Sequence, residues 1–411
     1  MISRATLAAS LCLTLLACRS RDGDALRLVW FGGDDEVTAI AEAVAEFERL
    51  HPEIPVEIQT VEWTRYTEKV MTMLLGDRPP DLARMSVQWG GRYHALGGLA
   101  DITPHLASAD LDDFLPARLA SCRQGETLFG LPHTSVGLMV FCNRAHFERA
   151  GIPIPSSPEE AWSWEEFSAI AERLQRETGV RHGWGVFRGW FPVIPFFYQS
   201  GGHLLRDGEP DFACDANVDA LTWFVDQHRR GVAPLTSWTP GGDAAETLFV
   251  RGDLAMIITG NWRLPAYARQ IEDFDWTVTY LPQRRRRATN AGGENLVVFS
   301  TPRVREAAQL AAFLTSPSQM ERFCARTLFL PTRRSLLGGE VPYHAHAEAL
   351  AMFARQALDF EPAWALEQGT PEFAALDTAF VQQIESAVMG FESPREALEA
   401  LNREYLDARF E

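Results

Sequence analysis

The sequence predicts an α/β protein with two lobes, each a mostly parallel sheet flanked by helices. The first observation is size: 411 residues, 46% of them hydrophobic, exceed what one core usually holds, because single cores rarely grow beyond about 250–300 residues. The second is that short apolar runs alternate with amphipathic stretches of helical period, the pattern of βα units. The third is the stretch 246–262, where a helix, a glycine stop and a buried strand follow one another.

The first strand and helix are predicted at residues 26–31 and 38–50, with a glycine-rich turn between them. Asp34 and Asp35 lie in this turn, directly before the helix. Carboxylates at a helix start accept hydrogen bonds from hydroxyls and are favoured by the helix dipole. We therefore predict that both bind ligand; capping of the helix is the alternative role.

A second strand begins at Val56, and a second helix covers residues 66–75. The next strand follows a Pro-Pro-Asp turn and leads into residues 86–89. Gln88 and Trp89 are therefore expected at the carboxyl end of that strand. A purely structural Trp89 remains the alternative.

The middle of the chain contains a predicted strand at residues 128–143, in which apolar side chains alternate. Ser163 and Glu166 form a capping box before a helix that ends at Gly179. Residues 189–202 concentrate aromatic side chains, and most of these are expected in a core. Further helices are predicted at residues 218–228, 307–314, 320–324, 370–391 and 393–398, and a strand at 276–282.

Two later segments deliver candidate binding residues. Trp262 follows the buried strand predicted at 254–259, and ligands of open α/β sheets lie at the carboxyl ends of strands. A packed loop tryptophan is the alternative. Residues 290–300 form a glycine loop that feeds an apolar strand, with Glu294 and Asn295 as its polar candidates. A hinge turn without ligand contact is the alternative there.

Residues 246–262 resemble a known signature, F-x-x-G-x-x-A-M-x-x-x-G-x-W. Its fixed positions are all present, as Phe249, Gly252, Ala255, Met256, Gly260 and Trp262. The signature is that of bacterial extracellular solute-binding proteins of the sugar type, which serve ABC importers, and the resemblance extends from about residue 26 to the C-terminus. It implies the type II periplasmic-binding-protein fold, with a hinge where the chain crosses between the lobes. Lobe one is then expected at residues 26–135 and 288–315, and lobe two at 136–287 and 316–411.

The resemblance also implies a carbohydrate bound between the lobes. Flat rings suit the apolar face of a sugar, and carboxylates and amides suit its hydroxyls. In maltodextrin-binding relatives the region of Trp190 and Phe191 supplies a stacking aromatic. The predicted ligand-binding residues are Asp34, Asp35, Gln88, Trp89, Trp190, Phe191, Trp262, Glu294 and Asn295. Asp377 is expected near the closed site.

The N-terminus reads as an export signal. Residues 1–17 carry one charge, Arg4, followed by an apolar run that is too short to span a bilayer. The run ends in Leu-Leu-Ala-Cys, which resembles the lipobox of bacterial lipoproteins, so Cys18 is the predicted lipidation site and residues 18–25 a tether. The protein is then expected in the periplasm or at the cell surface, anchored to the membrane. A plain secretory signal is the alternative.

The remaining cysteines do not reveal a bonding pattern. They are Cys122, Cys142, Cys214 and Cys324. An oxidising compartment permits disulfides, and four cysteines allow three connectivities. A bridge between Cys122 and Cys142 and buried free thiols both stay open. The absence of a C-x-x-C pair removes the zinc-site and redox-motif interpretations.

Composition and motifs also exclude other functions. A net charge of −17 disfavours nucleic acid as a partner. Neighbouring carboxylates on a helix do not face each other, so we predict no catalytic residues. We also predict no metal and no cofactor. The protein is expected to be a monomer whose partners are a carbohydrate and the ABC permease. The alternatives are glycerol phosphate esters or polyols, with Arg92 or Arg188 as a phosphate partner, a sensory binding protein, and a secreted glycoside hydrolase.

Overall fold

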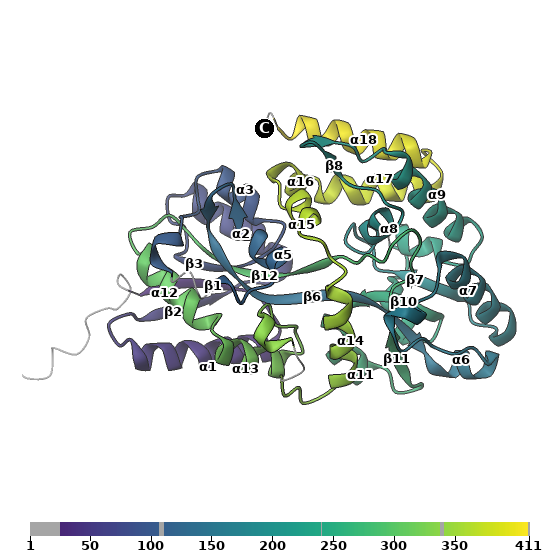
Figure 1. The fold of residues 1–411 in the computed structure, drawn as a ribbon, viewed down its shortest axis with the longest axis horizontal. Coiled ribbons are helices and arrows are strands. Elements are labelled where there is room, and N and C mark those ends of the chain that lie inside the picture. Colours follow the sequence, from purple (N-terminus) through teal and green to yellow (C-terminus); the bar gives the residue numbers. More distant parts are fainter. Residues whose placement is uncertain (1–24, 107–110, 240, 338–340, 410–411) are drawn as a thin grey trace, which may run out of the picture.

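The computed structural model describes residues 25–106, 111–239, 241–337 and 341–409. The predicted signal peptide and Cys18 lie outside the described residues. The chain forms two lobes that lie side by side along the long axis of the molecule (Figure 1).

An eight-stranded sheet runs through both lobes. Its strands are β1 (Leu26–Trp30), β2 (Val56–Thr60), β3 (Leu82–Ser86), β6 (Gly130–Asn143), β7 (His182–Val186), β10 (Leu254–Gly260), β11 (Trp276–Thr279) and β12 (Ala291–Val298). The order is β2-β1-β3-β12-β6-β10-β7, with β11 also paired to β6.

Helices cover both faces of the first-lobe strands. Alternate residues of β1 enter opposite cores, because successive side chains of a strand point to opposite faces: Trp30 packs with Phe47, whereas Val29 packs with Tyr66. The helices on the Trp30 face are α1 (Asp34–Leu50), α12 (Val304–Leu314) and α13 (Pro317–Thr327), and those on the Val29 face are α2 (Trp63–Leu75) and α3 (Gly90–Ala95).

The strand β6 joins the lobes and crosses the centre of the molecule (Figure 1). Its first half pairs with β12 and its second half with β10 and β11. The side chains of Leu138 and Val140 enter one core of the second lobe, and those of Met139 and Phe141 enter the other. The predicted alternation along this strand is confirmed.

The second lobe contains most of the remaining helices. They are α6 (Arg144–Ala150), α7 (Trp164–Thr178), α8 (Ile194–Gln199), α9 (Asp215–Arg229), α10 (Ala245–Val250), α11 (Leu264–Gln270), α14 (Ala347–Ala357), α17 (Asp377–Met389) and α18 (Pro394–Asp407). The short helices α5 (Pro116–Ala120), α15 (Pro362–Gln368) and α16 (Pro371–Ala375) lie where the lobes meet, since α15 contacts α5 and α16 contacts α3. The other strands form two small hairpins. One pairs β4 (Arg123–Gln124) with β5 (Thr127–Leu128), and the other pairs β8 (Leu205–Arg206) with β9 (Glu209–Pro210).

The structure differs from the sequence expectation in three respects. The helix α1 begins at Asp34, so the two aspartates belong to its first turn. The sheet is mixed, because the crossing strands β6 and β12 run antiparallel to their neighbours; the parallel pairs are β1 with β2, β1 with β3 and β7 with β10. The helix α13, expected in lobe two, packs on α1 through Met320 and Phe323. We therefore place residues 317–327 in the first lobe.

The cysteines of the described chain are all unbridged. Cys122, Cys142 and Cys324 are buried, and Cys214 is partly buried. Burial raises the pKa of the Cys122 thiol to about 12, so this thiol stays protonated at neutral pH. Across the described ranges, no helix has the length and apolar character needed to cross a bilayer.

Candidate functional site

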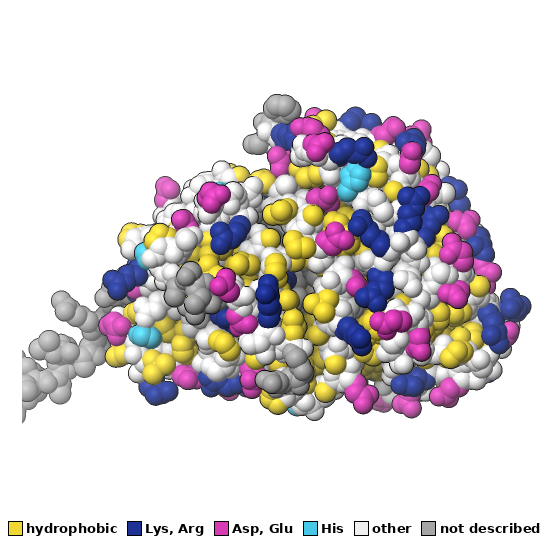
Figure 2. Space-filling view, in the orientation of Figure 1, with side chains coloured by type: hydrophobic (Ala, Val, Ile, Leu, Met, Phe, Trp, Pro, Cys, Tyr) yellow, Lys and Arg dark blue, Asp and Glu magenta, His cyan; other side chains and the backbone are white. Residues whose placement is uncertain are grey.

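A cleft of about 550 Å³ lies between the lobes, within the usual size range of small-molecule sites. Hydrophobic side chains gather where the lobes meet, and charges of both signs are scattered over the rest of the visible face (Figure 2). The cleft lies beyond the carboxyl ends of β1, β3, β7 and β10. Its walls are Phe31, Glu36, Trp63, Arg84, Ser86, Gln88, Val136, Phe187, Arg188, Gly189, Trp190, Phe191, Trp262, Gly292, Glu294, Phe329, Asp377 and Val381.

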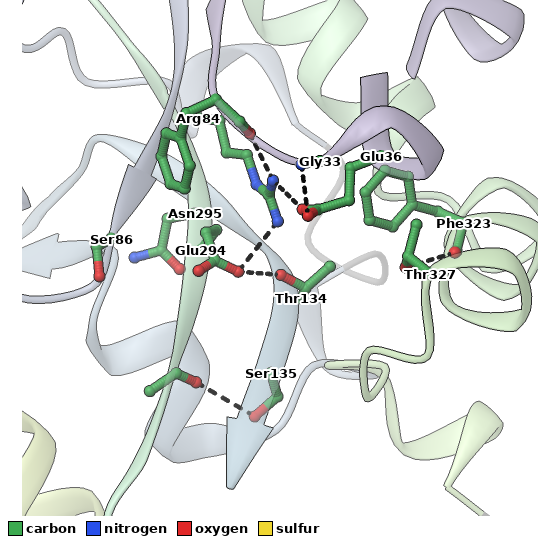
Figure 3. Close-up of polar contacts among 12 residues, drawn as sticks. Gly33, Glu36, Arg84, Ser86, Thr134, Ser135, Glu294, Asn295, Phe323 and Thr327 are labelled. Carbon is green, nitrogen blue, oxygen red and sulfur yellow. Dashed lines mark hydrogen bonds and ion pairs between the residues drawn. The ribbon is translucent and has the colours of Figure 1, made fainter. Parts of the chain in front are cut away.

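The first-lobe wall is built around Arg84, at the centre of β3 (Figure 3). Its guanidinium donates to Glu36 of α1, to Glu294 Oε2 of β12 at 3.3 Å and to the Phe31 carbonyl at 2.7 Å. Thr134 Oγ1 of β6 donates to the same oxygen of Glu294 at 2.5 Å. Four elements of the first lobe and the crossing strands therefore hold two carboxylates at the cleft.

The Arg84 side chain is 1% exposed, and a buried charge is costly unless it is paired. Burial lowers the pKa of Arg84, and the carboxylates of Glu36 and Glu294 more than offset this, so its pKa is raised overall. The guanidinium also lies over the rings of Trp30 at 4.7 Å and Phe31 at 4.8 Å. Arg84 is thus held as a permanent cation between two carboxylates.

Glu294 lines the cleft, and one of its two carboxylate oxygens accepts no hydrogen bond from the described residues. Within the described part of the chain, its side-chain hydrogen bonds from Arg84 and Thr134 both go to Oε2. The other oxygen, Oε1, is therefore available to accept a hydrogen bond from a ligand. Hydrogen bonds to a carboxylate are charge-assisted, and such bonds are stronger than neutral ones.

The second-lobe wall is aromatic. The ring of Trp262 meets Phe187 edge to face at 5.9 Å and Phe191 at 6.0 Å. Two glycines make room for these rings: a Cβ on Gly260 would lie 1.8 Å from the Trp262 ring, and one on Gly292 would lie 2.9 Å from the Phe191 ring. The indole position thus depends on the absence of a side chain at Gly260.

The loop after β7 is tied to the helix α17. The Trp190 side chain is buried, and its indole Nε1 donates to Asp377 Oδ1 at 2.6 Å. Arg188 forms an ion pair with Glu385 of the same helix. Trp190 therefore presents little ring surface to a ligand, and Asp377 is the polar group that α17 contributes to the cleft.

A second aromatic group lies on the first-lobe side. Trp63, at the start of α2, is 50% exposed and meets Phe31 edge to face at 4.8 Å. Trp89 stacks on Trp63 at 4.8 Å and on Tyr66 at 6.0 Å. Trp89 thus supports the exposed ring of Trp63 and does not itself line the cleft.

Comparison with known proteins gives the family. The sequence model of one family, the bacterial extracellular solute-binding proteins, matches residues 42–349, well over half of the chain. The chain belongs to this family of extracellular solute-binding proteins. Among its relatives is an uncharacterized lipoprotein in the oleD 5′ region of Streptomyces antibioticus, 27% identical in an alignment that covers 91% of this chain and 88% of the relative. A galactooligosaccharide-binding protein of Bacillus subtilis is 20% identical, over 96% of this chain and 93% of its own.

Solved structures share the fold of this solute-binding protein. An ABC substrate-binding protein of Listeria monocytogenes, in complex with cycloalternan, superposes with a TM-score of 0.80 at 20% identity and covers 93% of this chain and 97% of its own. The sugar-binding protein MalE of Xanthomonas citri has a TM-score of 0.77 at 23% identity, over 94% and 98%. The two-lobe α/β architecture predicted from the sequence is confirmed.

The structure brings together five of the nine residues that the sequence predicted for the site of this solute-binding protein. They are Gln88, Trp190, Phe191, Trp262 and Glu294. Asp34 and Asp35 are exposed at the start of α1 and do not line the cleft, because the helix turns Glu36 toward Arg84 instead. Trp89 lies behind Trp63.

Asn295 also lies outside the cleft walls. Its side chain is 1% exposed, and its Oδ1 and Nδ2 bond to Arg118 and Ser121 of the first lobe. Glu294 and Asn295 are neighbours on a strand, so their side chains leave opposite faces of the sheet. Only Glu294 can therefore serve the cleft.

Several cleft residues were not predicted from the sequence, chiefly Glu36, Trp63, Arg84 and Phe187. Arg84 carried a signal, because a charged residue inside an otherwise apolar strand is almost never buried without a partner. Phe187 directly follows the strand β7 and so obeys the rule that placed Trp262. In the described residues, no three His, Cys, Asp or Glu side chains are arranged to hold a metal ion.

Proposed function

We propose that this solute-binding protein binds a sugar or oligosaccharide in the cleft and delivers it to an ABC permease. The observation that carries the proposal is the pairing of an aromatic wall, Trp262 with Phe187 and Phe191, with the fixed carboxylates of Glu36 and Glu294. A sugar ring has an apolar C–H face and a rim of hydroxyl donors. The rings would pack on the face, and the carboxylates would accept from the rim.

The names of similar proteins support a carbohydrate. The Bacillus subtilis relative is a galactooligosaccharide-binding protein, and the Listeria monocytogenes structure holds cycloalternan. The identities are low, so they favour the class of ligand and leave the particular sugar open. A cleft of about 550 Å³ accommodates more than one sugar ring.

The charges of the cleft favour a neutral ligand over a phosphate ester. Three carboxylates line it, those of Glu36, Glu294 and Asp377. Both lining cations already have carboxylate partners, Arg84 with Glu36 and Glu294, and Arg188 with Glu385. Arg92, the other phosphate partner considered, is exposed and outside the cleft walls. An added phosphate would meet repulsion without a free cation to offset it.

We infer that the ligand leaves unchanged and that the protein is not an enzyme. A secreted glycoside hydrolase would use two carboxyl groups across one glycosidic bond. Here one arginine bridges Glu36 and Glu294, an arrangement suited to accepting hydrogen bonds. Chromatography of an oligosaccharide after prolonged incubation separates the two functions, because a hydrolase would yield shorter products.

We also propose that export and anchoring follow the N-terminal pattern, with residues 1–17 removed and Cys18 carrying the lipid. The protein would then act as a monomer beside its permease. Mass spectrometry of the membrane fraction tests the lipid on Cys18. A pull-down with the lipidated protein distinguishes a permease partner from the receptor that a sensory binding protein would use.

A thermal-shift screen over sugars, polyols and phosphate esters tests the ligand class, because a ligand that binds only the folded state raises the melting temperature. For the best sugar we expect Trp262→Ala to raise the Kd roughly tenfold or more in calorimetry. Trp276→Ala, at a partly buried tryptophan of β11 outside the cleft walls, is the control and leaves the Kd unchanged. Stabilisation by phosphate esters and not by sugars would contradict the proposal.

A further inference from the structure

The ladder between β6 and β12 is irregular at the cleft. Glu294 pairs with Thr134, but the next residue, Asn295, pairs with Pro132, so His133 has no partner on β12. Such a bulge locally interrupts the ladder and re-aims side chains, and bulges are frequent beside functional sites. Here it lies directly at the residue that offers its carboxylate to the cleft.

Arg118 fills this irregularity from the helix α5. Its Nη2 donates to the Thr134 carbonyl at 3.0 Å, to the Glu294 carbonyl at 3.5 Å and to Asn295 Oδ1 at 3.2 Å. The side chain is 97% buried, since only 3% is exposed. One nitrogen thus joins both crossing strands at the point where their ladder is interrupted.

A hydrogen-bond network links Arg118 to Asn295 through Ser121. Asn295 Nδ2 donates to the Ser121 carbonyl at 3.2 Å and to Ser121 Oγ at 3.1 Å, and Ser121 Oγ donates to the Arg118 carbonyl at 2.7 Å. Burial lowers the pKa of Arg118 to about 10, so it still carries its charge at neutral pH. The network fixes Asn295 on the α5 side of the sheet.

Fixing Asn295 on one face fixes Glu294 on the other, where Arg84 and Thr134 hold it toward the cleft (Figure 3). We propose that Arg118 is a positioning residue for the ligand site: by bonding the carbonyls of Thr134 and Glu294 at the bulge, it sets the position of the Glu294 carboxylate. Arg118 does not line the cleft, so it would act through Glu294. The inference rests on the proposed function of the cleft.

A double-mutant cycle tests this, with the best sugar from the screen as the probe and calorimetry as the measurement. We expect Arg118→Met to raise the Kd roughly tenfold in the wild-type background, and by less than about twofold in a Glu294→Gln background, because residues that act through one another are not additive. Arg118→Lys keeps the charge and one donor nitrogen, so its Kd should lie between those of the wild type and Arg118→Met. Arg118→Lys also provides the test if the Arg118→Met protein does not fold.

Arg333→Met is the matched control. Arg333 is also buried, with 5% exposed, and it pairs with Asp113 at 3.3 Å and lies over Phe114. Its loss should lower the melting temperature without changing the Kd. Equal losses from Arg118→Met in both backgrounds, or no loss in either, would overturn the positioning role. A wild-type protein that binds no carbohydrate at all would instead overturn the proposed function.

Discussion

At the scale of single residues, the cleft depends on close approaches that tolerate no added atom. Gly260 has an extended backbone, with φ of −107°, so another residue is not strained there. Its Cβ would nevertheless collide with the Trp262 ring, 1.8 Å away. Gly260→Ala should therefore displace the indole while leaving the strand β10 in place.

We predict that Gly260→Ala weakens binding of the best sugar roughly tenfold, because a stacking ring moved by about 1 Å loses up to about half of its dispersion contact and its alignment with the sugar. Calorimetry measures the Kd. Gly151→Ala is the control: Gly151 has a φ of 62° with no atom within 4 Å of an added Cβ, so it should cost stability and spare the affinity. An unchanged Kd for Gly260→Ala would show that the indole does not contact the ligand.

A second residue-scale prediction concerns pH. His228 is buried, and its Nδ1 bonds to the Phe224 carbonyl at 2.9 Å. Burial lowers its pKa to about 4 although the carbonyl opposes the shift, whereas in the unfolded chain the pKa is about 6.5. Between these values the unfolded chain binds a proton that the folded chain excludes, so the free energy of unfolding falls as the pH falls, by up to about 1.4 kcal/mol per pH unit.

Replacing the imidazole should remove this part of the pH dependence. We expect the free energy of unfolding of His228→Asn to fall less between pH 6.5 and 4.5 than that of the wild type, by roughly 2 kcal/mol. Urea titrations at several pH values provide the measurement, and His105→Asn, at an exposed site, should follow the wild type. Parallel curves for wild type and His228→Asn would contradict the assignment.

At the scale of elements, helix α7 shows how a local signal sets a boundary. The Glu166 backbone N donates to Ser163 Oγ at 3.1 Å, and the Ser163 N donates to Glu166 Oε2 at 2.7 Å. The helix then ends at Gly179, which has a φ of 75°. Both ends were predicted, because the reciprocal cap and the left-handed glycine depend only on neighbouring residues.

We predict that Ser163→Ala lowers the free energy of unfolding by about 1 kcal/mol, since it leaves the Glu166 N–H without its side-chain acceptor. Ser163→Asp retains an acceptor at the cap and should lose much less. Urea denaturation measures both variants. Equal losses for Ala and Asp would mean that the serine contributes through something other than its cap.

At the scale of the whole molecule, the cleft walls come from two lobes joined by β6 and β12. We predict that the best sugar stabilises the protein by about 2.7 kcal/mol at a hundredfold excess over its Kd, and that the radius of gyration falls as the lobes close on it. Small-angle scattering measures the closure. At the same ligand concentration, Trp262→Ala should show little stabilisation and little change in the radius of gyration. A sugar that stabilises the wild type without lowering its radius of gyration would contradict closure of the lobes.

The sequence by itself determined the alternation of strands and helices, the helix boundaries marked by caps and glycines, and the placement of Trp262 beyond its strand. These features follow from the periodicity and backbone preferences of neighbouring residues. The tertiary structure alone decided which polar groups meet in the cleft. Arg84 joins Glu294, 210 positions away, and the pairing of β12 with β3 and β6 decides that Glu294 faces the cleft while Asn295 faces away from it. Such choices depend on strand register and long-range packing, which no local pattern records.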